Sequence, residues 1–166
     1  MAQASSFAER WPVDVDLRSG DLFPKGRDWI VRVVREVLVA EDAQAGAISV
    51  VIGDDKLLQD LNRDYRGTDA PTDVLAFSMA EGAGFPTADE TPPVLGDVIV
   101  SWVRARAQAC ERGVEPREEM ALLLVHGCLH LLGYDHATEG ERAAMWARQE
   151  AIVALVLRPD GETGAS

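Results

Sequence analysis

The sequence predicts a single α+β domain in which a small mixed sheet of about four strands packs with about five helices around one central helix. Two observations favour this class. Strand and helix patterns intermix without the regular alternation of a doubly wound sheet, and two consecutive strand patterns flank a Gly-, Pro- and acid-rich loop typical of a hairpin. The length of 166 residues fits one domain over 1–166, with weakly ordered ends at about 1–11 and 159–166.

The first half of the chain mixes short strands with amphipathic helices. Alternating apolar and polar residues predict a strand over 13–17, and apolar residues at helical intervals predict a helix over 28–39. The β-branched run over 48–53 predicts a second strand. Asp54 or Asp55 then caps a further helix. The apolar face of that helix consists of Leu57, Leu58, Leu61 and Tyr65.

The two strands of the expected hairpin cover 74–79 and 98–101, and the acid-rich loop over 81–93 between them is suited to rim a site. A helix over 102–112 follows and ends near Gly113. The helix that carries the first two histidines is predicted to follow directly after this one.

Proline and acidic residues from Pro116 onward predict the start of the next helix. Its stretch over 120–125 is apolar all round, so this helix is expected to be central and packed on several sides. A final helix is predicted over about 139–156.

The three histidines of the chain all lie within eleven residues, as His126, His130 and His136. Residues four apart share a helix face, so the first two rings point to a common ion. Gly133 stops the helix and turns the chain, which carries the third histidine back to the same side. The central helix is therefore predicted to bind a metal.

Three imidazole ligands suit one zinc ion, or another transition metal, with a fourth position open. An open position is typical of a catalytic rather than a structural site. There the ion lowers the pKa of a bound water and polarises a phosphoryl or carbonyl oxygen. Hydrolysis is the reaction class that this chemistry favours.

Two other interpretations of the histidines stay open. A pair of core histidines one turn apart occurs without any metal. The second is a structural zinc, for which a cysteine is one option as fourth ligand. Cys128 points about 200° around the helix from the histidines and is expected to face away, which leaves Cys110.

The histidine spacing also equals that of metzincin proteases, H-E-x-x-H-x-x-G-x-x-H. In this chain Gly127 stands where those proteases carry the glutamate that acts as general base. Glycine cannot accept a proton, so peptidase chemistry by that route is disfavoured.

Composition limits the partners and the compartment. The formal net charge of −12 excludes broad nonspecific adhesion to nucleic acids or anionic membranes. No apolar run approaches the ~18 residues of a membrane span, and the start lacks the pattern of a secretory signal. Two cysteines do not form a disulfide framework. A cytoplasmic protein without a membrane partner is expected.

Three segments carry recognisable motifs: the histidine segment over 126–136, the segment over 62–77, which is similar to N-x-x-Y-R-x-x-D-x-P-T-D-V-L-S-F, and the segment over 95–101, which is similar to L-G-D-I-V-I-S. Together they resemble the YbeY family of metal-dependent bacterial endoribonucleases, which act in rRNA maturation. Ala76 stands where the family usually has serine, and Ser78 where it usually has proline.

The resemblance implies zinc on His126, His130 and His136, and metal-dependent cleavage of single-stranded RNA. It also implies work on rRNA of the ribosomal small subunit, in 3′-end maturation and ribosome quality control. The functional arginine of the family corresponds to Arg66, in a catalytic and substrate-binding role.

The residues support part of this independently. Arg66 ends a capped helix before a turn, so it either holds a phosphate in a bidentate manner or satisfies helix C-terminal carbonyls. Turn-building is the favoured role of three residues that flank proline: Asp69, Thr72 and Asp73. For Asp135, orienting a ligand ring and building the turn are both possible roles.

Two alternative functions remain at this point: a ribosome-assembly binding protein with structural zinc, and a metal-dependent amide or ester hydrolase. An acidic chain that binds RNA needs a local basic cleft. The candidates are Arg66, Arg63, Arg104 and Arg106. Without such a cleft, a partner protein would have to present the RNA.

Overall fold

The computed structural model describes residues 2–18, 26–79 and 93–159. Within these ranges the elements are α1 (Ala2–Arg10), β1 (Val13–Leu17), α2 (Gly26–Ala40), β2 (Ala47–Gly53), α3 (Asp55–Arg66), β3 (Val74–Ser78), β4 (Val94–Ser101), α4 (Trp102–Arg112), α5 (Pro116–Leu131) and α6 (Glu139–Val156). Apart from Pro93 and Pro159, the predicted acid-rich loop over 81–93 and the tail over 159–166 lie outside the described residues.

Four strands of the described chain form one mixed sheet in the order β1-β2-β4-β3. The first three in this order run parallel, and β3 runs antiparallel to β4, as the predicted hairpin requires. Strand β4 begins at Val94, four residues before its predicted start at Val98. The added residues include Gly96 and Asp97, which have low strand propensity and are held by pairing with β2 and β3.

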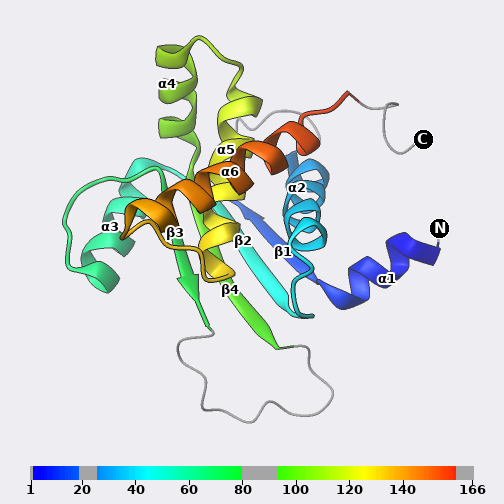
Figure 1. Ribbon diagram of the computed structural model, residues 1–166. Helices are drawn as coiled ribbons and strands as arrows, with labels where there is room; N and C mark the ends of the chain where they lie inside the picture. Colours follow the sequence, from blue (N-terminus) through cyan, green and yellow to red (C-terminus); the bar gives the residue numbers. More distant parts are fainter. Residues whose placement is uncertain (1, 19–25, 80–92, 160–166) are drawn as a thin grey trace.

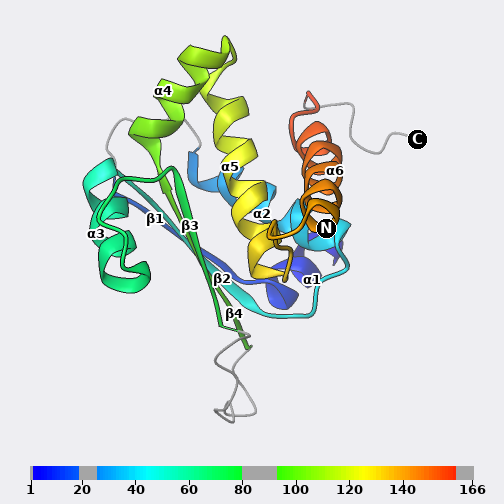
Figure 2. The same ribbon diagram turned by 60° about the vertical axis from the view of Figure 1, so that its left-hand side comes forward.

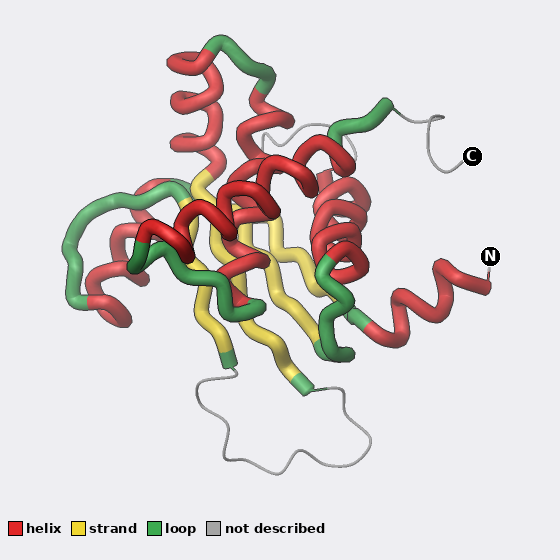
Figure 3. The backbone as a smooth tube through the Cα atoms, in the orientation of Figure 1, coloured by secondary structure: helices red, strands yellow, loops and turns green. Residues whose placement is uncertain are grey.

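Helices cover both faces of the sheet, with α3 alone on one side and α2, α5 and α6 on the other (Figure 2). The tube in Figure 3 shows the strands as one layer behind α5 and α6. The larger apolar core lies on the side of α2, α5 and α6. A smaller cluster of Leu58, Leu75 and Ile99 lies under α3. The α+β class predicted from the sequence is confirmed.

Helix α5 is the centre of the domain, because it packs against α2, α4, α6, β3 and β4 (Figure 1). The second half of this helix is buried except along one stripe. Leu122, His126 and His130 are half-buried, at intervals of four residues. The stripe carries both helical histidines, and these two side chains line a cleft together with Gly127.

Helix α1 was not predicted, and with it the described residues contain six helices rather than about five. Its apolar residues are few and mostly alanine, so they give only a weak helical pattern. Contacts at its end anchor it instead: the rings of Phe7 and Trp11 stack at 5.8 Å, and the Trp11 indole donates to the carbonyl of Gln44 at 3.1 Å. None of the described helices is long and apolar enough to cross a membrane.

Candidate metal centre

A cleft of about 730 Å3 lies at the free edge of β3. Helix α3 approaches this edge from one face of the sheet and α5 from the other. The described lining residues are Asn62, Tyr65, Arg66, Thr72, Asp73, Val74 to Ser78, His126, Gly127, His130 and Gly133 to His136. Another hollow of about 610 Å3, which α1, α2 and α6 line, has no histidine or cysteine among its described lining residues. Of these two hollows, the cleft at the edge of β3 is therefore the candidate metal site.

The two helical histidines converge in the cleft as their spacing predicts. Nε2 of His126 and Nε2 of His130 lie 3.1 Å apart, and the ring centroids lie 4.7 Å apart. Two imidazole nitrogens at zinc–nitrogen distances of 2.0–2.1 Å and a tetrahedral angle would be about 3.3 Å apart. The pair is therefore close to the separation that a shared ion needs.

His136 reaches the cleft through the turn that follows α5. Gly133 has a φ of 100°. Its N–H donates to the His130 carbonyl and the Tyr134 N–H to the Leu129 carbonyl, both at 3.1 Å. This is the Schellman pattern of helix termination, and it reverses the chain. The His136 ring lies 5.1 Å from that of His130 and 6.2 Å from that of His126.

The donors match a transition-metal site in kind and number, since three imidazoles line one cleft. Within the described residues, however, no group of three or more His, Cys, Asp or Glu side chains is gathered tightly enough to hold an ion as it stands. His136 is the exposed member of the set, and exposed side chains reorient rapidly. The site thus consists of two rings, His126 and His130, that already lie close enough to share an ion, with the exposed imidazole of His136 beside them.

Gln149 on α6 orients the first histidine, although the sequence did not indicate it. Its side chain is 2% exposed, and its Oε1 lies 2.8 Å from Nδ1 of His126. An amide oxygen accepts, so Nδ1 carries the proton and the lone pair of Nε2 faces the cleft. Such a partner fixes both the tautomer and the orientation of a ligand ring. Periodicity alone places Gln149 on a helix but cannot show that α6 crosses α5 at this point.

His130 is held in its neutral form. Burial lowers its pKa, and the nearby His126 and His136 rings lower it further, while the Tyr134 backbone and the Asp135 carboxylate act in the opposite direction. Only a neutral imidazole offers a lone pair to a metal. The environment of His130 therefore favours its ligating form at neutral pH.

Cys128 and Gly127 lie on other faces of α5. The Cys128 side chain is fully buried in the core, away from the cleft as predicted, and Cys110 is an exposed free thiol on α4 that does not line the cleft. A Cβ on Gly127 would lie 2.7 Å from Val98 Cγ1 and 3.2 Å from Val74 Cγ2. Any side chain at position 127, including the glutamate of a metzincin, would therefore force Val98 or helix α5 to shift.

Arg66 lines the same cleft from α3 and is exposed. Its Nη2 donates to the carbonyl of Ala76 at 2.7 Å, and its Cζ lies 5.4 Å from the centroid of the Phe77 ring. This bond goes to the edge of β3 rather than to the carbonyls of its own helix. A guanidinium has five N–H donors, so the contact leaves donors for an anion in the cleft.

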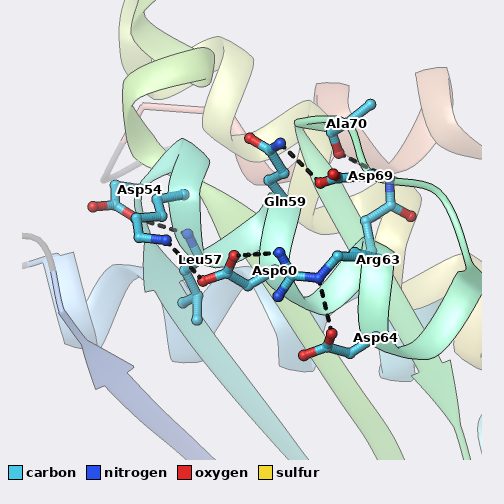
Figure 4. A network of polar contacts seen from close by, with 10 residues as sticks. Asp54, Leu57, Gln59, Asp60, Arg63, Asp64, Asp69 and Ala70 are labelled. Atoms are coloured by element: carbon cyan, nitrogen blue, oxygen red, sulfur yellow. Dashed lines mark hydrogen bonds and ion pairs between the residues drawn. The ribbon is translucent and has the colours of Figure 1, made fainter.

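The other candidate arginines do not line the cleft. Arg63 forms ion pairs with Asp60 at 3.3 Å and Asp64 at 3.1 Å (Figure 4). Arg104 pairs with Asp55 at 3.0 Å, and Arg106 lies over the ring of Trp102. Of the four arginines considered from the sequence, only Arg66 is among the described lining residues.

The acidic residues near the cleft are mostly engaged in local contacts. Asp69 accepts from the Gln59 amide at 3.0 Å, and Asp73 from the Gln108 amide at 3.3 Å (Figure 4 shows the first). The Asp135 carboxylate accepts from the His136 N–H at 2.7 Å and lies 3.5 Å from Nδ1 of His136. Asp135 thus both shapes the turn and lies next to a histidine ring.

The chain is similar to proteins of one family. The family described as Endoribonuclease YbeY matches residues 21–156. The Endoribonuclease YbeY of Geobacillus thermodenitrificans is 46% identical over 126 residues, covering 74% of this chain and 81% of that protein. That of Chloroflexus aurantiacus is 40% identical over 152 residues, covering 90% and 97%. The solution structure of TM1509 from Thermotoga maritima has a TM-score of 0.57 at 26% identity and covers 87% of this chain and 88% of that one.

Proposed function

The chain belongs to the YbeY family of endoribonucleases, and we propose that it is a hydrolase that cleaves single-stranded RNA with the help of a bound metal ion. The observation that carries this proposal is one cleft shared by three histidines and an arginine. The histidines supply ligands of the kind that zinc prefers, and the arginine suits a phosphate.

The proposed ligands are His126, His130 and His136, with zinc or another transition metal as the ion. When bound, the ion would supply a Lewis acid for the phosphoryl group and a source of hydroxide near neutral pH. The protein would hold this centre in place through Gln149, whose contact with Nδ1 leaves Nε2 of His126 as the ligand atom.

Arg66 is proposed to hold the phosphate that undergoes cleavage. Its contact with the Ala76 carbonyl anchors the guanidinium to β3, which limits the freedom it would lose on binding RNA. Its remaining N–H groups would bind the phosphate oxygens and stabilise the charge that develops on them. This positioning is the contribution of the chain itself to the reaction.

The charge of the cleft suits a local contact with RNA rather than broad attraction. The whole chain has a formal net charge of −12, and the described lining includes Asp73 and Asp135 beside Arg66. Attraction to a phosphate therefore depends on Arg66 and on the charge of the ion. A short single-stranded segment fits this arrangement better than a long duplex, which needs an extended basic surface.

A peptidase function has no support at this site. Position 127 is glycine, which has no base, and a glutamate there would clash with the Val98 and Val74 side chains. The sequence comparisons likewise concern endoribonucleases. We propose further that the RNA is small-subunit rRNA in the cytoplasm, cut during 3′-end maturation and ribosome quality control.

The decisive experiment measures cleavage of a labelled single-stranded RNA by the purified chain, with and without a chelator. Chelation and His126→Ala should abolish cleavage, and Arg66→Ala should reduce it by roughly 100-fold or more. Arg63→Ala is the matched control on the same helix, and it should cleave nearly as well as the wild type. Cleavage that survives both chelation and His126→Ala would refute the metal-dependent mechanism.

The cellular proposal has a separate test. A strain that lacks this chain should accumulate small-subunit rRNA with an unprocessed 3′ end. The wild-type chain should restore processing, and His126→Ala should not. Normal 3′ ends in the deleted strain would refute the role in rRNA maturation. The cleavage measured with purified RNA would still stand.

A further inference from the structure

An exposed tyrosine lies next to the candidate metal centre. Tyr65 is 71% exposed, more than any other large hydrophobic side chain among the described residues, and it lines the cleft that holds the histidines. The sequence pattern places it on the apolar face of α3, but the core under α3 does not cover it. Burial in the core under α3 thus does not account for an aromatic ring at this position.

Phe77 on β3 links Tyr65 to Arg66. The rings of Tyr65 and Phe77 meet edge to face, with centroids 5.6 Å apart and an angle of 60° between the planes. Arg66 places its Cζ 5.4 Å from the centroid of the same Phe77 ring. One ring therefore contacts both neighbouring side chains of α3 and holds an aromatic group beside the guanidinium.

We propose that Tyr65 is a stacking platform for a nucleobase of the RNA substrate, a role that rests on the proposed function of the same cleft. Single-stranded nucleic acids are bound by aromatic rings that stack on bases, together with cationic groups that hold the phosphates. Tyr65 and Arg66 provide one group of each kind, side by side on the cleft wall.

The edge-to-face contact explains why the platform is available. It uses a small part of the Tyr65 side chain, in agreement with the 71% exposure, and it restricts the motion of the ring. Because every base has a flat π surface, the platform would accept any base and favour unpaired over base-paired RNA. Tyr65 would thus contribute to the choice of single strands rather than to sequence preference.

The test compares binding of two ligands by the full-length chain, first with the metal bound and with mixing times too short for cleavage, and then in the presence of a chelator. The ligands are a fluorescein-labelled single-stranded oligoribonucleotide and an abasic oligomer with the same ribose-phosphate backbone. Anisotropy titrations give both affinities, and circular dichroism checks that each variant is folded.

Tyr65→Ala should weaken binding of the oligoribonucleotide roughly tenfold and leave binding of the abasic oligomer unchanged. Tyr65→Phe and Tyr65→Trp keep the ring and should bind close to the wild type. Trp146→Ala is the matched control, because Trp146 is 55% exposed on α6 and is not among the described residues of the cleft.

Three results would overturn the platform: wild-type affinity in Tyr65→Ala, an equal loss for both ligands, or a wild-type chain that does not prefer the ligand with bases.

Failure of the proposed function would give a different set of results. A chain that binds RNA through Tyr65 but never cleaves it would refute the endoribonuclease proposal alone. A chain whose metal-dependent cleavage has the same KM in Tyr65→Ala would refute the platform alone.

Discussion

Nδ1 of His126 lies 2.8 Å from Oε1 of Gln149, so a buried side chain of α6 holds a proposed metal ligand of α5. These residues are 23 positions apart in the sequence. The contact gives α6 a direct part in the candidate site, although of this pair only His126 is among the described residues that line the cleft.

Gln149→Leu should weaken metal binding, because the Nδ1 proton loses its acceptor and the ring loses its fixed tautomer. Loss of such a partner typically costs about 10- to 100-fold in metal affinity. Competition with a chromogenic chelator measures this directly. Gln149→Glu keeps an acceptor and should retain most of the affinity, so equal affinities in the Leu variant and the wild type would contradict the assigned role.

Metal removal should leave the protein folded. Helix α5 packs against α2, α4, α6, β3 and β4, and that packing does not depend on an ion. A bound ion at 100–1,000 times its dissociation constant adds about 3–4 kcal/mol of stability. We therefore expect a chelator to lower the thermal midpoint while the helical circular dichroism at 25 °C persists. Unfolding at 25 °C on chelation would instead indicate a structural ion.

Gly127→Ala should destabilise the protein by about 1–3 kcal/mol through overpacking against the sheet. The added Cβ would lie 2.7 Å from a Cγ of Val98, a stiff β-branched side chain. Gly140→Ala on α6 is the control, because a Cβ there meets nothing within 4 Å. Urea unfolding measures both, and a Gly127→Ala variant as stable as Gly140→Ala would show that α5 can move away from the sheet.

The two thiols should differ sharply in reactivity. Burial raises the pKa of Cys128 to about 12, whereas Cys110 is exposed on α4. Because the thiolate is the reactive form, the native chain should take up one equivalent of a maleimide at pH 7, at Cys110. Mass spectrometry of digested protein locates the label. Rapid modification of Cys128 in the native chain would mean that the core beside the histidines opens readily.

The Asp55 and Arg104 pair should give a pH-dependent contribution to stability. Burial alone would raise the pKa of Asp55, but hydrogen bonds from Arg104 and Ser101 outweigh it and hold the pKa below its ordinary value. A lowered pKa stabilises the fold at pH values above the unfolded pKa, and this stability is lost as pH falls through the folded pKa.

Asp55→Asn should therefore cost less than about 1 kcal/mol at pH 7, since the pair is partly exposed. The difference from the wild type should shrink as pH drops below about 4. Urea unfolding at several pH values measures it. A difference that stays constant down to pH 3 would show that charge is not its origin.

Local signals in the sequence were sufficient for most helices. Asp54 caps α3 through its side chain, Gly113 ends α4 in the left-handed region, and Pro116 opens α5. Each signal acts within a few residues of its own position, so it can be read without knowing the fold. Helix α1 lacks such a signal and depends on the distant Gln44 carbonyl.

The candidate site likewise has features that follow from the sequence alone and features that depend on the tertiary structure. By itself the sequence determined the pairing of His126 with His130, because four residues along a helix always share a face. Only the tertiary structure decided that Arg66 reaches the edge of β3 and that Gln149 meets His126. These outcomes depend on how α3 and α6 lie on the sheet and on α5, and that arrangement comes from burial of the whole core rather than from any local pattern.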